Sequence, residues 1–222
     1  AGQRGIHAGT GLRRHHTGIS RGTAGDSSRM LVFSLPFLCE DRTQAERLVN
    51  SEFAREISMD SLKSGATILG IGDAGGFRQF SNSVRMIRGP EDLRGLKMRS
   101  NGMDTINKTL EALGAEVMTV PYNDLYMALK AGTIDGQENP WVNSSGMRFY
   151  EVQKYFTEVN YQFHPEPFYV NTRWYESLPR EYQEILEECT QEMMKENNRL
   201  IDENEVQAME ISGPTLKYTT LP

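Results

Sequence analysis

Apolar and polar positions follow two different periods along residues 30–222, and their alternation predicts a mixed α/β fold. Short runs with apolar or strand-forming residues predict strands at 30–39, 66–76, 96–100, 117–120, 134–137, 155–160 and 168–171. Spacings of three and four predict helices at 42–62 with an internal break, at 101–113, before Ala131 and Gly132, after Asn139 and Pro140, and from Pro179 onward. Helical and strand patterns of this kind, in alternation, indicate an α/β protein.

Local signals fix several of the expected helix ends. Thr43 and Glu46 have the spacing of a capping box, which would start the helix of residues 42–62. Pro90 suits the first position of a short helical turn, and Asn101 and Gly114 suit the two ends of the next helix. The helix after Pro179 is the longest, and its predicted apolar stripe consists of Tyr182, Ile185, Leu186, Cys189 and Met193.

Composition excludes several classes of protein. The chain has 222 residues, of which 38% are hydrophobic and 24% charged, so it is long enough for one large domain or two small ones. No stretch approaches the roughly 18 to 20 apolar residues that span a bilayer, which argues against direct membrane insertion. The net charge of -6 disfavours a nucleic acid partner, because phosphate binding requires a positive surface.

Residues 1–29 differ from the remainder of the chain. They hold five arginines and one aspartate, seven glycines and no aromatic residue, so we interpret them as a disordered or foreign leader. His7, His15 and His16 lie in this segment, but adjacent histidines on a glycine-rich chain lack the spacing of a metal site. The apolar run 30–39 is interpreted as a buried strand rather than a signal-peptide core, since Phe37 and Leu38 are too bulky for a processing site.

Candidate chemical groups are few. Cys39 and Cys189 are too few for a disulfide scaffold, and His164 is the single histidine beyond the leader that could activate a thiol. Asp135 and Glu138 are interpreted as determinants of the fold, and Trp141 and Trp174 as buried aromatic residues. The stretch GIGDAGG lacks the glycine pattern of a dinucleotide site and the lysine of a P-loop, so no cofactor is predicted.

Five blocks carry a resemblance to a known family. They are GFRQFSNS, IRGPEDLRGLKMRS, LGAEVMTVPYNDLYMALKAGTIDGQENP, FYEVQKYF and SLPREYQEILEE, which follow one another in unbroken order. Over about residues 30–212 the chain resembles the DctP-like solute-binding proteins of TRAP transporters, the tripartite ATP-independent periplasmic transporters. The resemblance implies a two-lobed, clam-shaped α/β fold that closes over a small organic acid and delivers it to a TRAP membrane permease.

The resemblance also implies a domain division and a binding site. Residues 30–75 and 165–204 would form part of lobe I, and residues 76–164 and 205–222 part of lobe II. Both ends look truncated relative to the family. Arg99 matches the arginine that binds the ligand carboxylate, Arg78 a second arginine beside it, and Asn139 an amide that completes the hydrogen bonds. Tyr122 stands where the family has an aromatic residue, often Phe.

The residue types suit that role on physical grounds. A planar guanidinium meets a carboxylate with two parallel N–H donors, a geometry that lysine lacks. We therefore expect a non-enzymatic receptor, located in the periplasm on the strength of the resemblance. Two alternatives stay open: an inactive truncated fragment of such a protein, and an enzyme that uses the arginines to position a carboxylate substrate.

Overall fold

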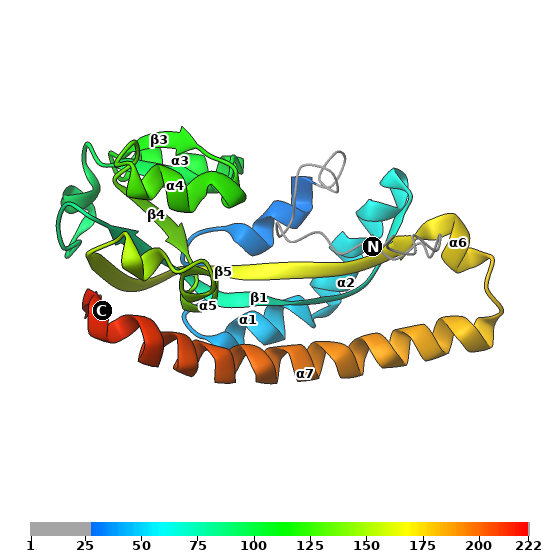
Figure 1. The fold of residues 1–222 in the computed structure, drawn as a ribbon. Helices are drawn as coiled ribbons and strands as arrows, with labels where there is room; N and C mark the ends of the chain where they lie inside the picture. Colours follow the sequence, from blue (N-terminus) through cyan, green and yellow to red (C-terminus); the bar gives the residue numbers. More distant parts are fainter. Residues whose placement is uncertain (1–27, 222) are drawn as a thin grey trace, which may run out of the picture.

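The computed structural model describes residues 28–221, which form the predicted mixed α/β fold with one long helix. Figure 1 shows that helix, α7 (Arg180–Ser212), running along the length of the molecule beside the two long strands β1 (Ala66–Asn82) and β5 (Tyr155–Asn171). At one end of these strands lie α3 (Asp104–Ala112) and α4 (Leu125–Lys130). The other helices lie along or beyond the strands; they are α1 (Arg42–Val49), α2 (Glu52–Ser58), α5 (Trp141–Gly146) and α6 (Thr172–Glu176).

One six-stranded sheet connects the molecule, in the order β3-β2-β4-β1-β5-β6. The four short strands are β2 (Lys97–Ser100), β3 (Glu116–Thr119), β4 (Gly136–Asn139) and β6 (Lys217–Thr220). Strand β2 is parallel to β3 and β4, and β6 is parallel to β5, whereas β1 is antiparallel to both of its neighbours. The long strands β1 and β5 therefore join the part of the sheet near α3 to the part near α2.

Both long strands were predicted as shorter pieces. β1 continues past the expected turn because Gly75 and Gly76, with φ of 142° and 93°, form a bulge-like irregularity in the strand. The pairing with β5 shifts register there, between Asp73 and Phe77. β5 is unbroken although it contains Pro165 and Pro167. These prolines are two residues apart, so their missing N–H groups face one edge of the strand and the pairing with β1 continues.

The helices between residues 42 and 131 agree with the sequence pattern, with differences at their ends. The expected break separates α1 from α2, and a 3₁₀ turn starts at Pro90 as predicted. The capping box is wrong: the N-cap is Asp41, whose Oδ1 accepts a hydrogen bond of 2.8 Å from Gln44 N. Asn101 does not cap α3: it lies two residues before the N-cap Met103, and its Oδ1 accepts from Met103 N at 3.0 Å. Four further 3₁₀ turns cover Met59–Ser64, Tyr122–Asp124, Phe149–Glu151 and Gly213–Thr215.

The strand predicted at 30–39 is wrong. Residues Ser28–Ser34 form a 3₁₀ helix, which places Met30 and Phe33 three apart on one buried face. Pro36 lacks an N–H group, and Phe37 has a φ of 56°, which is incompatible with a regular strand. A continuous apolar run is compatible with either structure, so its periodicity did not distinguish them.

The apolar stripe predicted on the longest helix lies largely in solvent. Tyr182 is 53% exposed and Ile185 47%, and Cys189 is also exposed. The buried residues of α7 are instead Thr190, Ala208 and Ser212. The face of α7 that packs on β1 therefore lies about a quarter turn from the predicted stripe.

The core consists of several clusters along the sheet. Near α1 and α2, Ile57, Ile71 and Phe77 are among the buried residues, and near α3 they include Met98 and Ile106. Trp141 is buried as predicted and stacks on Phe156 at 3.6 Å between ring centroids. Within residues 28–221, no helix is both long and apolar enough to cross a membrane. The division into two lobes stays a prediction.

Candidate functional site

The residues that the sequence singled out meet at one edge of the sheet. Arg99 and Asn139 lie at or next to the carboxyl ends of β2 and β4, and Tyr122 follows shortly after the end of β3. These three strands are parallel, so their carboxyl ends lie together, which is where open α/β sheets bind ligands. Arg78, on β1, joins them because its neighbour Gln79 lies opposite Asn139 in the β1–β4 register.

Arg99 is a buried cation with most of its hydrogen-bonding capacity unused. Its residue is 3% exposed, and its Nε donates to the Val120 carbonyl oxygen at 2.9 Å. No other residue of the described chain accepts a hydrogen bond from its two Nη groups. Burial lowers the pKa of Arg99, the charge of Arg78 lowers it further, and Glu138 acts in the opposite direction.

Arg78 is paired within the protein. Its Nε and Nη2 form a two-point ion pair with the Glu138 carboxylate, and Nη2 also donates to the Glu138 carbonyl at 3.0 Å. The side chains are 2% and 0% exposed. Burial by itself lowers the pKa of Arg78, but the charge and hydrogen bonds of Glu138 outweigh it and raise that pKa. Glu138, interpreted from the sequence as a fold determinant, is thus the partner that neutralises Arg78.

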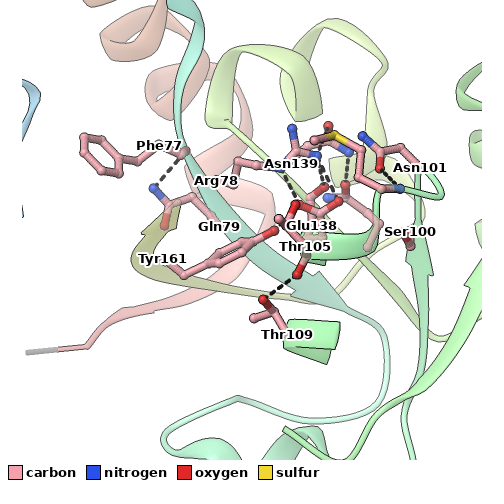
Figure 2. Close-up of polar contacts among 12 residues, drawn as sticks. Phe77, Arg78, Gln79, Ser100, Asn101, Thr105, Thr109, Glu138, Asn139 and Tyr161 are labelled. Atoms are coloured by element: carbon pink, nitrogen blue, oxygen red, sulfur yellow. Dashed lines mark hydrogen bonds and ion pairs between the residues drawn. The ribbon is translucent and has the colours of Figure 1, made fainter. Parts of the chain in front are cut away.

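Asn139 belongs to the same buried cluster. Figure 2 shows its side chain converging with those of Arg78, Glu138 and Tyr161. Its Oδ1 accepts from Arg78 Nη2 at 3.2 Å, and its Nδ2 donates to Gln137 Oε1. Asn139 does not cap the helix that follows, because the N-cap position of α5 is Pro140. Since α5 has only six residues, we attribute no anion site to its amino end.

Tyr122 forms one wall beside Arg99. The Arg99 guanidinium carbon lies 5.8 Å from the centroid of the Tyr122 ring, within range of a cation–π contact. The Tyr122 hydroxyl donates to the Asn143 carbonyl at 3.1 Å, and its ring meets Phe149 edge-on. Burial raises the pKa of Tyr122 and Arg99 lowers it, with burial dominant, so the hydroxyl stays protonated.

Three residues of β5 contribute to this region and were missed by the sequence reasoning. The Tyr161 hydroxyl donates to Glu138, and burial raises the pKa of Tyr161 well above its usual value. Gln162 lies directly opposite Arg78, and burial together with the charge of Arg78 lowers the pKa of His164 well below 6.5. No local motif marks these residues, because only the pairing of β1 with β5 brings them to the arginines.

The other candidate groups lie apart from this cluster. Within residues 28–221, no three His, Cys, Asp or Glu residues are placed to hold a metal ion. Cys39 is a buried free thiol and Cys189 an exposed one. The histidines of the leader, His7, His15 and His16, lie outside the described residues.

A comparison with known families identifies one match. The family described as bacterial extracellular solute-binding protein, family 7 (DctP) matches residues 17–213. Residues 17–29 of this match lie in the segment 1–29 that was interpreted as a disordered or foreign leader, so the interpretation as foreign is wrong for them. The chain is 30% identical over 186 residues to the C4-dicarboxylate-binding periplasmic protein DctP of Vibrio cholerae, covering 82% of this chain and 55% of that protein. It is 27% identical over 186 residues to the 2,3-diketo-L-gulonate-binding periplasmic protein YiaO of Escherichia coli, covering 84% and 56%.

Solved structures agree with this match. A TRAP periplasmic solute-binding protein from Sulfitobacter sp. NAS-14.1, with bound β-D-galacturonate, has a TM-score of 0.84 at 26% identity and covers 89% of this chain and 66% of its own. One from Shewanella oneidensis, with bound succinate, has a TM-score of 0.81 at 27% identity and covers 87% and 64%. The chain spans about half the length of the curated relatives it matches. By the extent of the family match, the chain belongs to the DctP family, family 7 of the bacterial extracellular solute-binding proteins.

Proposed function

We propose that this protein binds a small organic acid in the periplasm through a salt bridge between the ligand carboxylate and Arg99, and delivers it to a TRAP membrane permease. The family is one of solute-binding proteins, not of enzymes. Its solved relatives include proteins with bound succinate and with bound L-malate. The permease partner and the delivery step rest on family membership.

The observation that carries the proposal is the state of the Arg99 guanidinium. It is buried at the carboxyl end of β2, and among the described residues only its Nε has a hydrogen-bond acceptor. A buried charge without a partner is costly, and a carboxylate meeting both Nη groups would remove that cost. Each charge-assisted hydrogen bond of this kind is worth about 1.5–3 kcal/mol.

The other three residues support Arg99 in different ways. Arg78 is already neutralised by Glu138, so its role is to hold Asn139 in place beside the carboxylate. Tyr122 covers the guanidinium with its ring and keeps its hydroxyl on the backbone of α5. This division makes Arg99 the primary carboxylate contact and Arg78 a positioning residue.

The two alternatives make different demands. An enzyme would need a nucleophile, base or metal beside the arginines. Among the described residues of this cluster, the lowered pKa of His164 makes its imidazole a weak base, and both cysteines lie elsewhere. A fragment without activity would bind no acid, which the experiment below also detects.

A thermal-shift screen of the chain against small organic acids tests the proposal. An acid at a hundred times its Kd stabilises the folded state by about 2.7 kcal/mol, which raises Tm by about 5–11 °C for a chain of this size. We expect Arg99→Ala to abolish the shift. The control Arg88→Ala removes an exposed arginine and should keep it. No shift with any acid from a cooperatively folded chain would contradict the proposal, as would an undiminished shift in Arg99→Ala.

A further inference from the structure

The charges around Arg99 leave room for one carboxylate. Arg99 and Arg78 are the two cations of the cluster, and Glu138 already compensates Arg78. The remaining groups, Tyr122 and His164, are neutral because burial raises the pKa of Tyr122 and lowers that of His164. One uncompensated positive charge therefore remains, and one ligand carboxylate balances it. A second carboxylate beside the first would be a buried charge without a partner.

Two buried polar atoms beside Arg78 have no hydrogen-bond partner among the described residues. They are Gln162 Oε1 and His164 Nδ1. The Gln162 residue is 3% exposed. An acceptor buried in this way costs free energy unless something donates to it, so its presence indicates a ligand or an ordered water.

The sheet register places these atoms on the face of Arg78. Gln162 is directly opposite Arg78, and Phe163 is opposite Phe77, with the two rings 5.7 Å apart. Directly opposed residues of antiparallel strands point to the same face. Because side chains alternate along a strand, Gln162 and His164 share the face of Arg78, whereas Phe163 and Phe77 share the other.

The chemistry of these atoms selects the group that would meet them. An amide oxygen accepts only, so a carboxylate, which has no proton to donate, leaves Gln162 Oε1 unsatisfied. An ammonium group donates, but the uncompensated charge of Arg99 would repel it. A hydroxyl is neutral, donates to Gln162 Oε1, and can either donate to or accept from the neutral imidazole of His164.

The next charged cluster along the strands offers no free cation to a second carboxylate. Asp73 lies opposite Pro165, the residue after His164. Arg42 binds Asp73 at 2.6 Å, Asp202 at 2.9 Å and Glu205 at 2.9 Å, so one guanidinium faces three carboxyl groups. By the same register rule Asp73 shares the face of Phe163, and the guanidinium that it binds is already shared by three carboxyl groups. This cluster therefore has no free cation with which an anionic ligand end could pair.

We infer that the ligand of this protein is a monocarboxylate that carries hydroxyl groups, with its carboxylate on Arg99 and one hydroxyl held by Gln162 and His164. The inference rests on the proposed function, because it takes Arg99 as the carboxylate contact. It makes Gln162 a specificity-determining residue that separates hydroxy acids from both deoxy acids and dicarboxylates.

Three four-carbon acids test this inference by isothermal titration calorimetry on the full chain: D-erythronate with hydroxyl groups, butyrate without them, and succinate with a second carboxylate. One neutral hydrogen bond to the protein changes affinity by about three- to tenfold. We expect erythronate to bind at least that much more tightly than butyrate and also more tightly than succinate. Gln162→Leu should reduce erythronate binding to the level of butyrate and leave butyrate unchanged.

The controls separate a specific effect from a structural one. Asn198 on α7 also has a buried oxygen without a partner, so Asn198→Leu is a matched variant that should leave the erythronate-to-butyrate ratio unchanged. Gln162→Met keeps the side-chain length and serves if the leucine variant does not fold. The inference is overturned if succinate binds more tightly than erythronate, or if neither Gln162 variant changes the ratio. If the acids then bind without this preference but binding still requires Arg99, the proposed function stands. If no acid binds, both the inference and the proposed function are overturned.

Discussion

The ion pair between Arg78 and Glu138 gives a prediction whose size follows from its burial. Glu138→Ala leaves a guanidinium that is 2% exposed without its carboxylate, and it also removes the acceptor of the Tyr161 hydroxyl. Breaking a buried pair by removing one partner costs about 3–5 kcal/mol. For a chain of this length that corresponds to a fall in Tm of about 6–20 °C. Urea unfolding followed by circular dichroism measures the free energy directly.

Two further variants decide whether the unpaired charge is the cause. The double variant Arg78→Met with Glu138→Leu removes both charges and should recover most of the loss, because apolar replacement of a buried pair is often neutral. Glu184→Ala breaks an exposed ion pair between Arg180 and Glu184 and should leave the free energy of unfolding unchanged. The reasoning is refuted if Glu138→Ala is as stable as the wild type, or if the double variant is no better than the single one.

Three other perturbations follow from the structure. Gly75→Ala should lower the free energy of unfolding by more than about 1 kcal/mol, because φ is 142° and the new methyl group would lie 2.1 Å from Asn143 Oδ1. Gly146→Ala is the control, since its methyl group would meet no atom within 4 Å, and urea unfolding curves compare the two variants. Trp141→Ala should cost about 3–5 kcal/mol by removing the ring that stacks on Phe156, and a loss below 1 kcal/mol by urea titration would contradict its core role. His164 stays neutral in the folded protein, whereas in the unfolded chain it binds a proton below about pH 6.5. The free energy of unfolding should therefore decline as the pH falls through 6.5, by at most about 1.4 kcal/mol per pH unit. His164→Gln should flatten that decline in unfolding curves measured on both sides of pH 6.5.

The helices were predictable where the cues are local. Pro90, Gly114 and Pro179 mark element ends in the sequence, and the structure begins or ends elements next to each of them. The 30–39 run was not predictable, because a short apolar segment fits a strand and a 3₁₀ helix equally well. The buried face of α7 depends on what packs against β1, which periodicity within the helix does not contain.

The candidate site was predictable only in part. Arg99, Arg78, Asn139 and Tyr122 were named from the family resemblance, and the structure brings them together, although ligand contact stays a prediction. That Arg78 is neutralised could not be read from the sequence, because Glu138 is 60 residues away and meets it through the sheet. Gln162 and His164 were missed for the same reason: long-range strand pairing, not a motif, places them beside the arginines.

A crystal structure of the chain with a bound small carboxylate, for which D-erythronate is the first choice, tests the central claim most directly. The account predicts both carboxylate oxygens about 2.7–2.9 Å from the two Nη groups of Arg99, with Arg78 still paired to Glu138. A carboxylate bound to Arg78 after displacing Glu138, or bound away from Arg99, would contradict it.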